Sequence, residues 1–170
     1  MVVSGNSIST DSESRNNNMS RAYEVTSYFL IDGVAVAVDD FHGRLRDEYY
    51  IIGWIELFIN SQQVLGRAHC DLVDQLWAYM IDGMTQLDRG VDVWDTFFPD
   101  QPLKLSFNRV GESNLLITIG ELKHSVSYHS FLLAIAHGGN QFFEKMNQIL
   151  PQSTDVWTDY LQKCKLLSDG

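Results

Sequence analysis

Short strand-type runs alternate with long helix-type runs along this chain, and this order limits its fold more than any other feature. From Tyr23 to Leu65, β-branched and aromatic residues form short runs separated by turn residues such as Asp32-Gly33, a pattern that favours β-strands. The run Tyr49 to Asn60 predicts a long, largely buried strand. From Leu72 to Leu87 apolar residues recur every three or four positions, which predicts an amphipathic helix.

The same order then repeats in the second half of the chain. Residues 91–101 mix aromatic and acidic side chains, and because Pro99 interrupts regular structure we expect a loop there. Three runs between Leu103 and Ser127 predict strands. Helical spacing over 130–150 and over 154–167 predicts two further helices, the first weakened in its middle by two glycines.

Strands joined by short connections pair antiparallel, and helices that follow them cover the sheet. We therefore expect an α+β fold with one antiparallel sheet of about five to six strands, packed on one face by two long helices and a shorter C-terminal helix. Two strand-rich blocks, each followed by a helix, are also compatible with an internal duplication. Residues 1–20 are polar and predict a disordered tail, so that residues 21–170 form a single α+β domain.

The charge of the chain restricts the classes of partner. Acidic residues outnumber basic ones 22 to 12, which gives a formal net charge of −10. Such a field repels nucleic acids and anionic membrane surfaces and attracts a basic protein. A role in solubility alone would also account for the negative net charge.

Cysteine use and hydropathy indicate the compartment. Cys70 and Cys164 have no motif spacing and predict free thiols in a reducing environment. No apolar run reaches the 18 or so residues that a membrane span needs, and we find no signal-peptide pattern. We therefore expect a cytoplasmic protein.

No pattern of residues indicates an active site. His69-Cys70-Asp71 is the one adjacent trio of metal-type residues, but adjacent side chains point apart, and Asp71 is placed to cap the following helix. His129 and His137 would lie two helical turns, about 12 Å, apart, which is too far for a shared metal. Phosphate-binding loops and nucleophile elbows are also missing from the sequence. We therefore predict no catalytic residue, no metal and no cofactor.

The segment from residue 88 to residue 100 is the strongest candidate for a binding site. It combines aromatic and acidic side chains, which suits recognition of a basic protein. The alternative is that its aromatic residues face the core and its acids are solvated. The candidate residues are Asp88, Asp92, Trp94, Asp95, Phe97, Phe98 and Asp100. The acids Asp39, Asp40, Asp47 and Glu48 form a second, weaker candidate.

Three stretches resemble a known class of proteins. They are Trp54-Ile55-Glu56-Leu57-Phe58-Ile59-Asn60, the helical run from Leu72 to Met84 with Leu76-Trp77-Ala78-Tyr79, and Phe97-Phe98-Pro99-Asp100-Gln101-Pro102-Leu103. Their texture is similar to that of small bacterial immunity proteins of polymorphic or contact-dependent toxin systems. The resemblance covers roughly residues 49–150 and implies neutralisation of a cognate toxin, often a nuclease, through protein binding. It transfers no individual functional residue.

Three hypotheses on function follow. The first is an immunity-type protein that binds a basic toxin domain. The second is an unrecognised hydrolase that uses His129 or His137 with nearby carboxylates, which would require a pocket that gathers these groups. The third is a structural homo-oligomeric subunit. The missing catalytic pattern favours the first, so we expect the chain not to be an enzyme.

Overall fold

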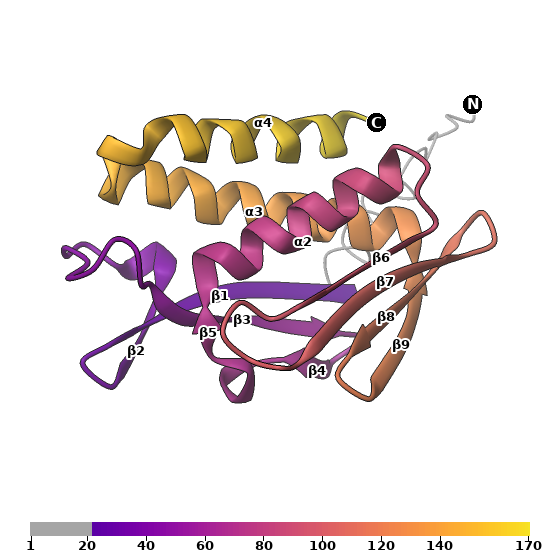
Figure 1. Ribbon diagram of the computed structural model, residues 1–170, viewed down its shortest axis with the longest axis horizontal. Helices are drawn as coiled ribbons and strands as arrows, with labels where there is room; N and C mark the ends of the chain where they lie inside the picture. The colour runs from indigo at the N-terminus through magenta and orange to yellow at the C-terminus, as the bar shows by residue number, and fades with distance from the viewer. Residues whose placement is uncertain (1–21) are drawn as a thin grey trace, which may run out of the picture.

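The computed structural model describes residues 22–170, which form two antiparallel sheets and the α-helices α2, α3 and α4 (Figure 1). The predicted disordered tail over residues 1–20 lies outside the described residues. The first sheet has the strand order β2-β1-β3-β4, and β5 pairs with β3 beside this path. Its strands are β1 (Tyr23–Ile31), β2 (Val34–Ala37), β3 (Ile52–Ile59), β4 (Gln62–Leu65) and β5 (Asp71–Leu72).

The second sheet is a meander with the order β6-β7-β8-β9. Its strands are β6 (Val93–Phe97), β7 (Lys104–Val110), β8 (Asn114–Ile119) and β9 (Leu122–Ser127). The prediction of a loop over 91–101 is therefore wrong for residues 93–97. Pairing with β7 makes a strand of a segment whose own pattern does not show one.

The α+β class and the antiparallel pairing are confirmed, but the prediction of one sheet with five to six strands is wrong. The physical reason is that β6 to β9 are joined by short connections and pair with their neighbours in the sequence, whereas the long helix α2 separates them along the chain from β1 to β5. The strands after α2 therefore form a sheet of their own. The two sheets also differ in strand order, so the structure gives no support to an internal duplication.

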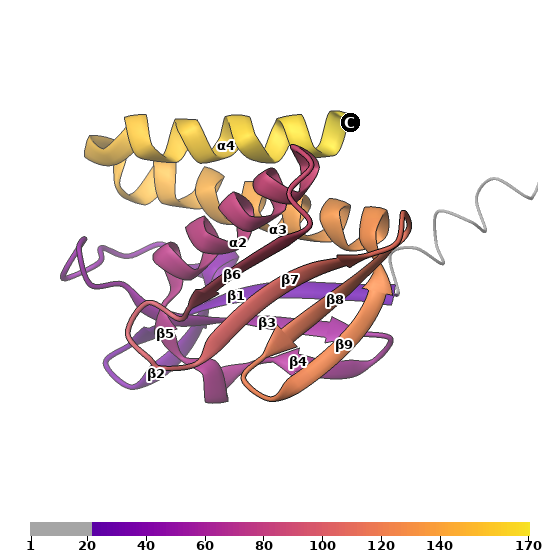
Figure 2. The ribbon, with the colours of Figure 1, turned by 45° about the vertical axis from the view of Figure 1, so that its right-hand side comes forward.

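The helices lie on one side of the molecule and the sheets on the other, as Figures 1 and 2 show from two directions. They are α2 (Val73–Asp88), α3 (Tyr128–Ile149) and α4 (Thr154–Asp169), with 16, 22 and 16 residues, so α4 is shorter than α3 but not than α2. Short 3-10 helices are η1 (Val38–Asp40), η2 (Arg67–His69) and η3 (Pro151–Ser153). Buried apolar residues of both sheets and of α2, α3 and α4 join in one core cluster within the described residues. In residues 22–170, none of the helices combines the length and the apolar character that a membrane crossing requires.

Two glycines in the middle of α3 allow a close helix crossing. A Cβ atom on Gly138 would lie 2.8 Å from the ring of Trp77, and one on Gly139 would lie 2.8 Å from Ile81. Trp77 and Ile81 belong to α2 and are fully buried. The glycines thus leave α3 continuous and let α2 approach its backbone.

Candidate protein-binding surface

The pleat of β6 separates the candidate aromatic residues onto two sides. Trp94 points inward, where its ring stacks on Phe107 with 5.3 Å between the ring centroids and packs over the backbone of Gly83 in α2. Val93 and Phe97 point outward and are 51% and 60% exposed. Because side chains alternate along a strand, Asp95 lies between them on the outward face.

Phe98, the next residue, returns to the interior. It is 3% exposed, and its ring centroid lies 6.1 Å from that of His69. Phe98 is therefore a core residue, as the alternative interpretation has it, and Trp94 is partly buried against the core. Of the three predicted aromatic anchors, Phe97 alone is exposed.

The four candidate acids are spread along β6 rather than gathered at one point. Asp88 and Asp92 are exposed near the start of the strand, Asp95 lies in it and Asp100 follows it. The Cα atoms of Val93 and Phe97 alone are about 13 Å apart at the rise of a strand. Asp95 forms an exposed ion pair with Lys104 at 3.0 Å.

Asp71 shapes the connection between β6 and β7. It is 4% exposed, and its carboxylate accepts hydrogen bonds from the backbone N–H of Leu72 at 2.6 Å, the backbone N–H of Asp100 at 3.0 Å and Nε2 of Gln101 at 3.1 Å. We predicted that Asp71 would cap the following helix. The structure contradicts this, because Leu72 is the N-cap residue of α2 and Asp71 lies in β5.

Tyr50 links the loop over residues 41–51 to this connection. Its hydroxyl donates a hydrogen bond of 3.0 Å to Oδ2 of Asp100, and this bond and the charge of Asp100 raise the pKa of the Tyr50 phenol. Tyr50 is 51% exposed and its neighbour Tyr49 is 82% exposed. Figure 1 shows the loop and the β6–β7 connection at the same end of the molecule. We call Tyr49, Tyr50, Asp95, Phe97 and Asp100 the aromatic–acidic surface.

The two tyrosines escaped the sequence-based prediction. We predicted that Tyr49 and Tyr50 begin the long strand, because aromatic residues favour strands. In the structure the strand begins at Ile52 and the tyrosines lie in the loop before it. Two adjacent tyrosines in a loop would have indicated an exposed aromatic pair, but the sequence pattern did not identify residues 49 and 50 as part of a loop.

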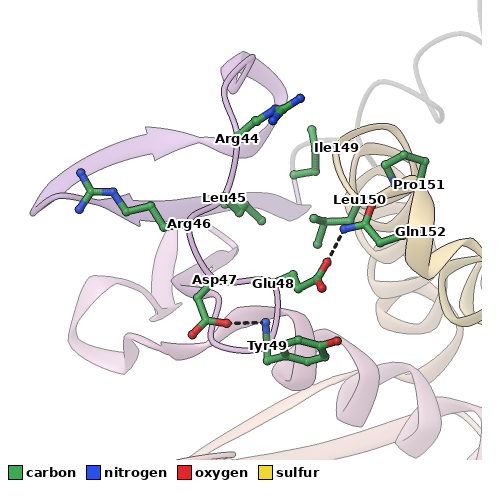
Figure 3. Close-up of a pocket in the computed structure, with 10 residues that line it drawn as sticks. All are labelled: Arg44, Leu45, Arg46, Asp47, Glu48, Tyr49, Ile149, Leu150, Pro151 and Gln152. Atoms are coloured by element: carbon green, nitrogen blue, oxygen red, sulfur yellow. Dashed lines mark hydrogen bonds between the residues drawn. The ribbon is translucent and has the colours of Figure 1, made fainter.

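The same loop borders a pocket of about 580 Å³, shown in Figure 3. Residues 44–49 line one side and residues 149–152, which join α3 to α4, line the other. Gln152 donates a hydrogen bond to Glu48 across the pocket, and the N–H of Tyr49 donates to Asp47 at 2.9 Å. These two acids of the weaker candidate therefore fix the loop. Asp39 and Asp40 lie exposed in η1.

Each side chain of the trio at 69–71 has its own environment in the structure. Burial, followed by the charge of Asp71, raises the pKa of the Cys70 thiol, which keeps it protonated. Burial lowers the pKa of His69, whose Nδ1 accepts a hydrogen bond from the N–H of Gly66 at 3.2 Å. In the part of the chain that the structure describes, we find no group of three or more His, Cys, Asp or Glu residues that could hold a metal ion.

A groove between α3 and α4 bears on the hydrolase hypothesis. It has a volume of about 740 Å³ and is lined in part by His137, Glu144 and Asp169. Within residues 22–170 no hydrogen bond joins His137 to either carboxylate, and His129 does not line the groove. The hydrogen bonds of the described residues therefore do not assemble a His–carboxylate pair in this groove.

Comparisons with known proteins give no further guide. The chain matches no protein-family model, and searches among curated proteins and among solved structures find no significant match. The resemblance to immunity proteins therefore rests on the three stretches quoted above.

Proposed function

We propose that this chain is a cytoplasmic binding protein that captures a basic partner protein through the aromatic–acidic surface, in the manner of an immunity protein that neutralises a toxin. The observation that carries the proposal is the hydrogen bond between Tyr50 and Asp100. It joins two segments whose exposed aromatic side chains lie beside carboxylates. Tyrosine and phenylalanine supply large, rigid contact areas, and such residues are enriched in the centres of interfaces.

The charges of the chain support the same proposal. A net charge of −10 attracts a basic partner over a long range and raises the rate of encounter. The acids near β6 then select the orientation in which positive groups meet the strand. The chain would cover the part of the partner that lies on this surface. If that part includes an active site, the partner enzyme is inhibited by occlusion.

The surface is also held in a defined shape before binding. The buried carboxylate of Asp71 fixes the backbone at Asp100, and Asp100 accepts the hydroxyl of Tyr50. Side chains and loops that are already ordered lose less conformational entropy when a complex forms. The arrangement therefore suits tight binding.

Affinity capture from the source organism at low and high salt, with identification of the retained protein, is the first step of the test. The purified partner is then titrated calorimetrically with the chain and with the variant Phe97→Ala. We expect weakening by roughly 10- to 100-fold, because truncation of a central aromatic residue costs about 1–3 kcal/mol. Leu166→Ala is a matched control, because Leu166 is 63% exposed and lies on α4.

Co-expression of the partner with the chain in a bacterial host then tests neutralisation. Growth arrest by the partner should be relieved by the natural chain and less so by Phe97→Ala. A partner that is not basic, or equal affinities for Phe97→Ala and Leu166→Ala, would contradict the proposed surface. A dimer that forms with rising concentration and is lost in Phe97→Ala would instead support the homo-oligomeric subunit.

A further inference from the structure

β6 is an edge strand of the second sheet, and the direction of its backbone groups can be derived from its neighbours. The N–H of Arg109 donates to the carbonyl oxygen of Asp92 at 2.8 Å, and the N–H of Phe98 donates to that of Leu103 at 2.8 Å. In an antiparallel pair, hydrogen-bonded and non-hydrogen-bonded residues alternate. Since residues 92 and 98 bond to the β7 side, so do 94 and 96, whereas residues 93, 95 and 97 direct their N–H and C=O groups away from β7.

Within residues 22–170, no strand pairs with these outward groups. Among the described residues, the backbone N–H groups of Val93, Asp95 and Phe97 form no hydrogen bond with another backbone group. The carbonyl oxygen of Phe97 accepts one long bond of 3.3 Å, from the hydroxyl of Thr96. A row of unpaired groups on an edge strand is a template for the addition of a strand.

The side chains of β6 restrict which strand can be added. On the outward face, exposed Val93 and Phe97 flank Asp95, so the edge presents an apolar, an acidic and an apolar side chain in turn. Asp95 contacts Lys104 through Oδ2, and its side chain is 53% exposed, so that it can also meet a cation on the added strand. Opposite charges directly across a strand pair stabilise it, and like charges destabilise it.

This pattern argues against a second copy of the chain as the added strand. Two β6 strands paired antiparallel over their full length place Val93 opposite Phe97 and Asp95 opposite Asp95. The central pair then consists of two carboxylates. A basic residue at the central position of the added strand removes this repulsion.

We propose that β6 binds its partner by strand addition, and that the added strand carries Lys or Arg opposite Asp95 with apolar residues two positions before and two positions after it. The inference rests on the proposed function for the source of the strand, a basic protein. The main-chain hydrogen bonds supply the alignment and Asp95 supplies the selectivity. Phe97 belongs both to this edge and to the aromatic–acidic surface.

A peptide titration tests strand addition without the natural partner. The probe is the peptide Thr-Val-Thr-Lys-Thr-Val-Thr, and its control is Thr-Val-Thr-Glu-Thr-Val-Thr. The amides of the ¹⁵N-labelled chain are followed by NMR at increasing peptide concentration. We expect the lysine peptide to shift the amides of Val93, Asp95 and Phe97, to slow their hydrogen exchange, and to bind several-fold more tightly than the glutamate peptide.

Two variants locate the interaction. Val93→Pro removes an N–H that β7 does not use, so the sheet should persist while peptide binding is lost, and Val93→Thr, which keeps the N–H, should bind as the natural chain does. Asp95→Lys should reverse the preference, so that the glutamate peptide binds better. This second variant decides the matter if Val93→Pro fails to fold.

The outcomes separate this inference from the proposed function. If the lysine peptide leaves the three amides unchanged, or if both peptides bind equally, strand addition is wrong, even where Phe97→Ala still weakens capture of the partner. If the peptide binds at β6 but the partner is insensitive to Phe97→Ala, the proposed function fails while the strand-accepting edge stands.

Discussion

Asp74, in the first turn of α2, is expected to lower the stability of the fold at neutral pH. Its side chain is largely buried, and its Oδ1 atom has no hydrogen-bond partner. Burial raises the pKa of the carboxyl group from 3.8 to about 6, although nearby backbone N–H groups act in the opposite direction. Buried carboxylates are costly because they lose contact with water.

The sign of the effect follows from proton linkage. Between pH 4 and pH 6 the folded chain holds the proton on Asp74 and the unfolded chain releases it, so the free energy of unfolding falls as the pH rises through this range. The difference between the two pKa values corresponds to about 3 kcal/mol, which is an upper limit because Asp74 is not fully buried. Above pH 6 the full cost is present.

The substitution Asp74→Asn removes the charge and keeps the shape of the side chain. We expect it to raise the free energy of unfolding at pH 7 by about 1–3 kcal/mol, and to have little effect near pH 4. Urea unfolding followed by tryptophan fluorescence, at several pH values between 4 and 8, measures both quantities. Asp155→Asn is the control, because Asp155 is exposed in the first turn of α4 and should change stability slightly and in the opposite direction.

The reasoning would be refuted by an Asp74→Asn chain that is no more stable than the natural one at pH 7. It would also be refuted by a gain of equal size at pH 4 and pH 7. In either case the environment of Asp74 does not disfavour its charge.

Other predictions test the packing and the thiols. Gly83→Ala should lower stability by about 1–3 kcal/mol despite better helix propensity, because the new Cβ would lie 2.6 Å from the ring of Trp94; a higher melting temperature would contradict this. Asp71→Ala should cost about 1–3 kcal/mol and speed hydrogen exchange at the amide of Asp100, whereas unchanged exchange there would show that the carboxylate does not hold the connection. Burial raises the pKa of Cys164 to about 12, so a thiol reagent at pH 8 should modify this residue only as the chain unfolds, and rapid modification of the folded chain would count against it.

The helices could be predicted closely from the sequence because their signal is local. The expected spans 72–87 and 130–150 correspond to Val73–Asp88 and Tyr128–Ile149. Their apolar stripes face the core over four turns or more, so a few unusual residues do not disturb the pattern. The glycines of α3 weaken its propensity, yet packing against α2 keeps that helix continuous.

The sheets could be predicted only in part because pairing depends on residues far apart in the sequence. No local pattern shows that the strands after α2 pair with one another and not with the strands of the first sheet. β6 combines outward apolar residues with an inward Thr96, so its alternation is concealed. Contacts with the rest of the fold decide whether such a segment forms a strand.

The candidate site was predictable to a similar extent. Phe97 and the acids of 88–100 follow from composition, whereas the inward direction of Trp94 follows only from its pairing with Phe107 across β6 and β7. The role of Asp71 depends on a partner 29 residues away. Such a contact leaves no trace in local spacing.

The bond between Tyr50 and Asp100 also bears on when the aromatic–acidic surface of a newly made chain is complete. The tyrosine is synthesised with the first sheet, but the aspartate follows α2 and takes its position only when β6 and β7 have paired. Domains form during translation from the N-terminus onward. The ribosome therefore has to release most of the chain before the aromatic–acidic surface is complete, and a product truncated after α2 would contain the two tyrosines without Asp95, Phe97 and Asp100.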